Sequence, residues 1–106
     1  MKMSNTAAVL ENAIAHVKEN NPPVGAGLER WNRSLMAAGR SAGYRLFLVC
    51  HVKRFLAWNN WGLEPKRLEA FFLHLSEAQV PFEKRKAWEK VLGATGYASV
   101  FAALGR

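Results

Sequence analysis

Apolar residues recur at steps of three and four along most of this 106-residue chain, and no run alternates between apolar and polar residues long enough to form a strand. The stretch from Thr6 to Glu19, for example, places Ala7, Leu10, Ile14 and Val17 on one helical face. Half of the residues are hydrophobic and 22% are charged, which is a globular composition. We therefore expect one small all-α domain, a compact bundle of about five to six helices.

Proline and glycine residues mark where the predicted helices begin and end. After the first helix, the expected segments are Gly27 to Ala38, Ser41 to Trp58, Pro65 to Ala78, Pro81 to Leu92 and a short one from Ala98 to Leu104. The pair Pro22-Pro23 predicts an extended linker, which would separate an N-terminal unit of residues 1–22 from a basic helical core of residues 23–106. Gly39 is expected to end the second helix.

The third helix is the longest of the five after the linker, and we expect it to be central and most buried. Its predicted apolar face consists of Tyr44, Phe47, Leu48, His51, Val52 and Phe55, widened by Val49 and Leu56.

The positive charge lies in the later part of the chain. Residues 1–30 contain equal numbers of basic and acidic side chains, whereas residues 31–106 contain twelve Lys or Arg against five Glu, which accounts for the whole net charge of +7. Clustered cations gain free energy by releasing counterions from nucleic acid, so this asymmetry favours a polyanionic partner over an ordinary basic surface.

The basic residues fall into three clusters with aromatic neighbours, and they are the candidate DNA-binding residues. The clusters lie on the third helix, at the start of the fourth and on the fifth; their members are Arg40, Arg45, Lys53, Arg54, Lys66, Arg67, Lys84, Arg85, Lys86 and Lys90. Glu83 and Glu89 interleave with the last cluster, so solvated helix faces are the alternative. Trp58 and Trp61 flank the turn after the third helix and could stack on bases or pack beneath the loop.

Catalysis by this chain is not expected. The three histidines, His16, His51 and His74, fall on different predicted helices, and the chain has no aspartate. Cys50 is the only cysteine and points about 100° away from its neighbour His51 on a helix, so they form no nucleophile–base pair. We expect no metal site, no cofactor and no enzymatic activity.

A cytoplasmic, nucleoid-associated bacterial or phage protein is the expected setting. The lone cysteine excludes an intrachain disulfide. Charged residues interrupt the N-terminal apolar positions, and the longest apolar runs are far too short for a membrane span.

Two segments suggest a family. Arg40-Ser41-Ala42-Gly43-Tyr44-Arg45 followed by Val52-Lys53-Arg54-Phe55-Leu56-Ala57-Trp58 resembles the first helix of the core-binding, SAM-like domain of phage and integron tyrosine recombinases. The stretch from Leu63 to Leu75 is similar to the family's second helix, and residues 80–92 stand where its basic third helix would lie. The resemblance covers about residues 28–92.

This resemblance implies a four-helix arrangement, with an extra N-terminal helix, that forms half of a clamp around duplex DNA with helices near the major groove. The family's catalytic residues have no counterparts in this sequence, and neither Tyr44 nor Tyr97 lies in a matching context. The chain would then be either a recombinase fragment or a free-standing relative that binds DNA without cleaving it.

The alternative hypothesis is a small protein-interaction or regulatory protein, encoded by a mobile element, that inhibits or assists a nucleic-acid-binding partner. The first helix motivates this alternative, since its apolar face could dock on a second copy of the chain or on another protein.

Overall fold

The computed structural model describes residues 2–64 and 66–93 and, near the C-terminus, residues 100, 102 and 104. In this part of the chain it has no strand and contains α1 (Lys2–Asn20), α2 (Pro22–Ala37), α3 (Ala42–Trp58), α4 (Arg67–Glu77) and α5 (Phe82–Leu92). The predicted all-α bundle is confirmed. Pro65 and most of the predicted last helix lie outside the described residues, but Val100 and Leu104 are helical and buried.

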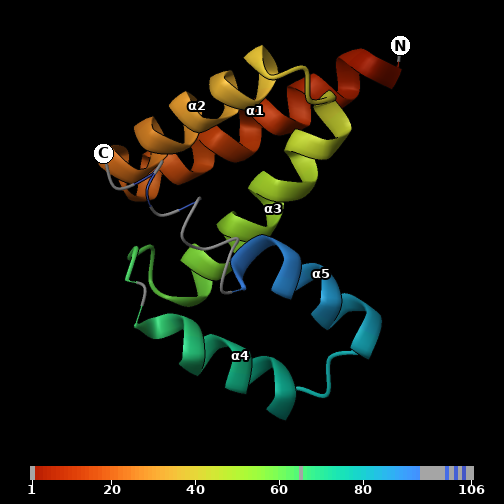
Figure 1. The fold of residues 1–106 in the computed structure, drawn as a ribbon. Helices are drawn as coiled ribbons and strands as arrows, with labels where there is room; N and C mark the ends of the chain where they lie inside the picture. Colours follow the sequence, from red (N-terminus) through yellow and green to blue (C-terminus); the bar gives the residue numbers. More distant parts are fainter. Residues whose placement is uncertain (1, 65, 94–99, 101, 103, 105–106) are drawn as a thin grey trace.

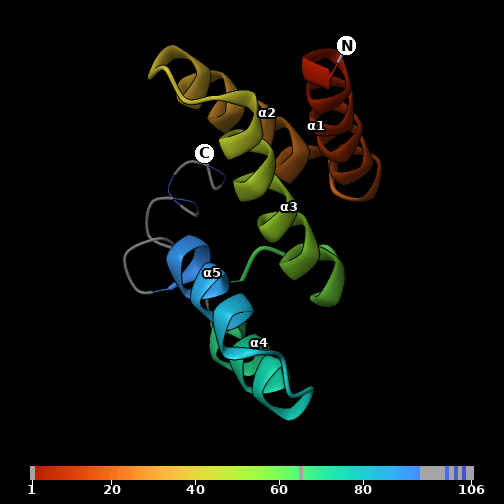
Figure 2. The ribbon, with the colours of Figure 1, turned by 90° about the vertical axis from the view of Figure 1, so that its right-hand side faces the viewer.

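The helices form two hairpins joined by α3. Figure 1 shows α1 and α2 side by side at one end of the molecule and α4 with α5 at the other, while α3 runs between them. The rotated view of Figure 2 shows the same division: α4 and α5 lie at one end of the molecule, and the N-terminus of α1 lies at the other. The principal extents are 38 × 28 × 23 Å.

The predicted extended linker between the first two helices is wrong. Only Asn21 separates α1 from α2, and Pro22 and Pro23 occupy the first positions of α2. Proline is tolerated there because the first backbone N–H groups of a helix have no intrahelical acceptor. The restriction on the residue before proline falls on Asn21, which has a non-helical backbone (φ −154°, ψ 88°) and caps α2 by accepting a hydrogen bond from Val24 N–H.

The first helix is part of the main core. Leu10, Ile14 and Val17 are buried against the rest of the chain, although Ala7 of the same predicted face is exposed. The face that motivated docking on a partner is therefore used inside the molecule. The interaction hypothesis loses the feature on which it was based.

The third helix is central, as expected, but its buried face is rotated from the predicted one. Tyr44 is exposed, Phe47 and His51 are half-buried, and the buried positions are Arg45, Leu48, Val49, Val52, Phe55 and Leu56. The rotation arises because α3 packs on α1 and α2 as well as on α5. The helix spans nearly the predicted residues, and Ser41 caps it by accepting from Tyr44 N–H. Gly39, with a φ of 81°, follows the end of α2 as expected.

Aromatic rings join α3 to the second hairpin. The ring of Phe71 on α4 lies 5.3 Å from that of Phe55, 5.2 Å from that of Trp58 and 4.9 Å from that of Trp88 on α5. Phe71 is thus the shared contact of three helices. This packing sets where the basic residues of α4 and α5 lie relative to those of α3.

Candidate nucleic-acid interface

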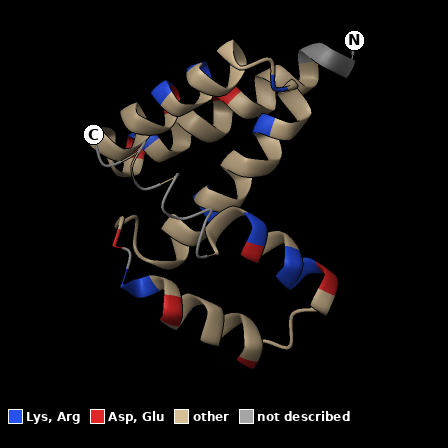
Figure 3. Cartoon of the chain, viewed as in Figure 1, with Lys and Arg blue, Asp and Glu red and all other residues tan. Residues whose placement is uncertain are grey.

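The structure distributes the ten candidate DNA-binding residues over three environments. The side chains of two of them, Lys53 and Arg85, are half-buried and that of Arg45 is buried; the exposed ones are Arg40, Arg54, Lys66, Arg67, Lys84, Lys86 and Lys90. Figure 3 shows Lys and Arg along α5 and at the start of α4, with acidic residues among them.

Arg45 serves the core. Its Nε donates to the backbone oxygen of Arg40 at 3.2 Å, and its Nη1 donates to Asn32 Oδ1 on α2 at 2.9 Å. A guanidinium engaged in this way ties α3 to α2 and is 9% exposed, so we exclude Arg45 from the candidate interface. Its spacing from Leu48 and Val49 already placed it on the helical face that is buried.

Arg67 and the two tryptophans belong to the junction after α3. The Nε of Arg67 donates to Asn59 Oδ1 at 2.9 Å, and its guanidinium carbon lies 4.9 Å from the centroid of the Trp58 ring. Trp61 is half-buried, with its ring 5.2 Å from that of His16 on α1. Both tryptophans therefore pack against neighbouring elements. Of the two possibilities for these rings, packing beneath the loop and stacking on bases, the structure favours packing.

A cleft between α3 and α5 brings together two of the three clusters. It has a volume of about 310 Å³, and its lining comprises His51, Arg54, Glu83, Lys84, Ala87 and Trp88. Arg54 and Lys84, far apart in the sequence, thus line one concave surface together with Ala87 and Trp88. We call this surface the α3–α5 cleft.

His51 contributes no positive charge to the cleft near pH 7. Burial is the main cause that lowers its pKa, and the positive charge of Arg54 lowers the pKa further. The hydrogen bond to the Phe47 carbonyl raises the pKa but does not cancel the effect of burial. The 2.7 Å contact of Nδ1 with that carbonyl oxygen assigns the proton to Nδ1, which leaves Nε2 as an acceptor. The ring also lies 4.6 Å from that of Trp88. The charges of the cleft are therefore those of Arg54, Lys84 and Glu83.

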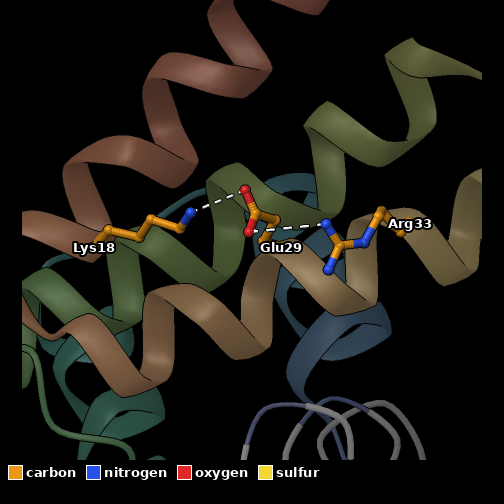
Figure 4. Close-up of polar contacts among 3 residues, drawn as sticks. All are labelled: Lys18, Glu29 and Arg33. Atoms are coloured by element: carbon orange, nitrogen blue, oxygen red, sulfur yellow. Dashed lines mark hydrogen bonds and ion pairs between the residues drawn. The ribbon is translucent and has the colours of Figure 1, made fainter.

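In the described part of the chain, the cations of the cleft have no carboxylate partner, whereas Lys18 and Arg33 of the first hairpin share one. Figure 4 shows Glu29 between Lys18 and Arg33, with N–O distances of 2.9 Å and 3.9 Å. The hydrogen bond and charge of Lys18 are the main causes that lower the Glu29 pKa. Among the described residues, neither Arg54 nor Lys84, Lys86 or Lys90 forms an ion pair.

Other kinds of site find less support in the described residues. No group of three or more His, Cys, Asp or Glu among them could hold a metal ion. Cys50 is a free, half-buried thiol, and His74 is exposed with its ring stacked 5.5 Å from that of Trp58. None of the described helices has the length and apolar character needed to cross a membrane.

Comparison with known proteins adds no relative. No protein-family model matches the chain, and neither a curated protein nor a solved structure matches it.

Proposed function

We propose that this chain is a non-catalytic module that binds duplex DNA through the α3–α5 cleft and the exposed lysines of α5. The observation that carries the proposal is the meeting of Arg54 and Lys84 on one cleft, without a carboxylate partner for either side chain among the described residues. Two such cations on one concave surface can contact neighbouring phosphates and release their counterions.

The start of α5 supports the same reading. Pro81 occupies the N-cap and supplies no side-chain hydrogen bond, so the first backbone N–H groups of α5 stay available to an anion. Lys84 lies in this first turn, where its charge adds to that of the helix dipole, and Glu83 in the same turn offsets part of this positive charge. Lys86 and Lys90 continue the exposed positive charge along the helix.

The resemblance to the core-binding domain of tyrosine recombinases also supports the proposal. It covers about residues 28–92, which include α3, α4 and α5, the helices that carry most of the candidate residues. In this proposal the chain holds DNA as one half of a clamp and leaves any strand cleavage to another protein or domain.

The test is binding of a fluorescent random-sequence duplex, measured by anisotropy over a series of salt concentrations. The log–log slope of affinity against salt should be about −0.9 for each phosphate contacted. The double variant Arg54→Gln/Lys84→Gln should weaken binding and make the slope less steep by about two contacts. The single variants Arg54→Gln and Lys84→Gln should each make the slope less steep by about one contact. Arg30→Gln removes one charge from an exposed position on α2 and is the matched control for each of these single variants.

Two results would refute the proposal. One is the absence of duplex binding by the wild-type chain at low salt. The other is a double variant whose slope equals that of the wild type and of Arg30→Gln, because the cleft would then contact no phosphate.

A further inference from the structure

An exposed aromatic side chain marks the tip of the second hairpin. Phe82 is the first residue of α5 and is 72% exposed, the most of any large hydrophobic residue in the described part of the chain. Burying a phenylalanine is favourable, so a ring left in water at a fixed position invites a ligand that covers it.

The backbone around Phe82 holds the ring in a defined place. The turn before it is closed by hydrogen bonds from Val80 N–H to the Leu75 oxygen at 3.1 Å and from Gln79 N–H to the Ser76 oxygen at 3.1 Å. Pro81, at the N-cap of α5, accepts from Arg85 N–H at 3.0 Å. Little backbone entropy therefore remains to be lost when a ligand covers the ring.

One cation contacts the ring. The Nζ of Lys86, one helical turn after Phe82, lies 5.2 Å from the ring centroid of Phe82, a cation–π contact. The other exposed large hydrophobic residues of the described chain are on four different helices: Val9, Met36, Tyr44 and Leu73. A protein-docking surface would need a contiguous apolar patch, whereas one ring beside a lysine suits a base next to its phosphate.

We propose that Phe82 stacks on a nucleobase of the bound DNA and acts as a wedge at a position where the duplex is easily unstacked. This inference depends on the proposed function, since the exposed lysines of α5, Lys86 among them, would hold the DNA backbone while Phe82 contacts the base. Apolar side chains that enter base steps must overcome the unstacking free energy, which is smallest at a mismatched or unpaired base. The chain should thus prefer a duplex with one unpaired base over a fully paired one.

The test compares Phe82→Ala, Phe82→Trp and the control Leu73→Ala, a residue of α4 that is 61% exposed. Anisotropy gives the affinity of each for a fully paired duplex and for the same duplex with one unpaired 2-aminopurine, whose fluorescence reports stacking. Phe82→Ala should lose about tenfold in affinity for the unpaired-base duplex, with an unchanged salt slope. Phe82→Trp should keep the affinity and the fluorescence change, and Leu73→Ala should match the wild type.

The inference would be overturned if Phe82→Ala bound the unpaired-base duplex with wild-type affinity. If Arg54→Gln/Lys84→Gln still reduced the salt slope in that case, the proposed function would remain supported. Absence of DNA binding by the wild type would overturn both. A third result would also overturn the inference: Phe82→Ala could lose binding to phosphatidylserine vesicles while its DNA affinity stayed unchanged. That result would assign the ring to a lipid surface.

Discussion

Gly25 of α2 packs directly on the backbone of Lys18 in α1. A Cβ added to the glycine would stand 2.5 Å from the Lys18 Cα, a distance that no side-chain movement can relieve. The two helices therefore approach each other closely only because position 25 has no side chain. This contact brings Lys18 within reach of Glu29 as well.

We expect Gly25→Ala to destabilise the protein by about 1–3 kcal/mol, because the helices must move apart to accept the methyl group. Gly43→Ala on α3 is the matched control, since a Cβ there would meet nothing within 4 Å. Removing a glycine from an open helical position should raise stability by about 0.5–1 kcal/mol. Urea denaturation followed by circular dichroism measures both changes, and equal effects of the two substitutions would contradict the close packing.

Phe71 should be among the most sensitive positions of the second hairpin. It is 3% exposed and contacts rings of α3 and α5, so Phe71→Ala should cost about 3–5 kcal/mol. Phe71→Leu keeps most of the buried volume and should cost markedly less. The exposed Phe82→Ala should leave the denaturation midpoint almost unchanged; a comparable loss for all three variants would count against Phe71 as the shared contact.

Arg45→Met separates a structural arginine from a DNA-binding one. The substitution leaves Asn32 Oδ1 and the Arg40 carbonyl without this donor, and we expect a loss of about 1–3 kcal/mol in unfolding free energy. The salt slope of DNA binding should stay at its wild-type value, because Arg45 contacts no phosphate in our proposal. Arg54→Gln should show the opposite pattern, with full stability and a reduced slope.

His51 should make stability depend on pH. Its pKa in the folded protein is below the ordinary value near 6.5, so the unfolded chain binds the proton more tightly. Its contribution to stability is therefore complete above about pH 6.5 and is lost as the pH falls from there toward the lowered pKa of the folded state. The groups that face it are Arg54 on its own helix and Glu83 and Lys84 on α5.

The comparison is with His51→Asn, which cannot titrate. Unfolding free energies measured from about pH 5 to pH 8 should fall more steeply toward acid in the wild type than in the variant. Parallel curves for the two proteins would show that the folded and unfolded chains bind the His51 proton equally.

Much of the local structure follows from the sequence because it depends on neighbouring residues. Ser41 and Gly39 bound α3 and α2 as expected, since a serine hydroxyl caps a helix start and glycine adopts a positive φ at low cost. The double proline is ambiguous in the sequence, because proline both restricts the residue before it and fits the first turn of a helix. Only the structure showed that the restriction falls on Asn21.

The candidate site depended more on tertiary contacts. Periodicity identified the lysines and arginines as helical, but it did not separate the roles of Arg45 and Arg54. Arg45 is buried against α2, whereas Arg54 lies in the cleft beside α5. The sequence by itself determined the all-helical character, the approximate limits of α3, α4 and α5 and the excess of positive charge, all of which arise from short-range spacing and composition. The tertiary structure alone decided the rotation of α3, the burial of Arg45 and the meeting of Arg54 with Lys84, because these depend on how helices distant in the sequence pack together.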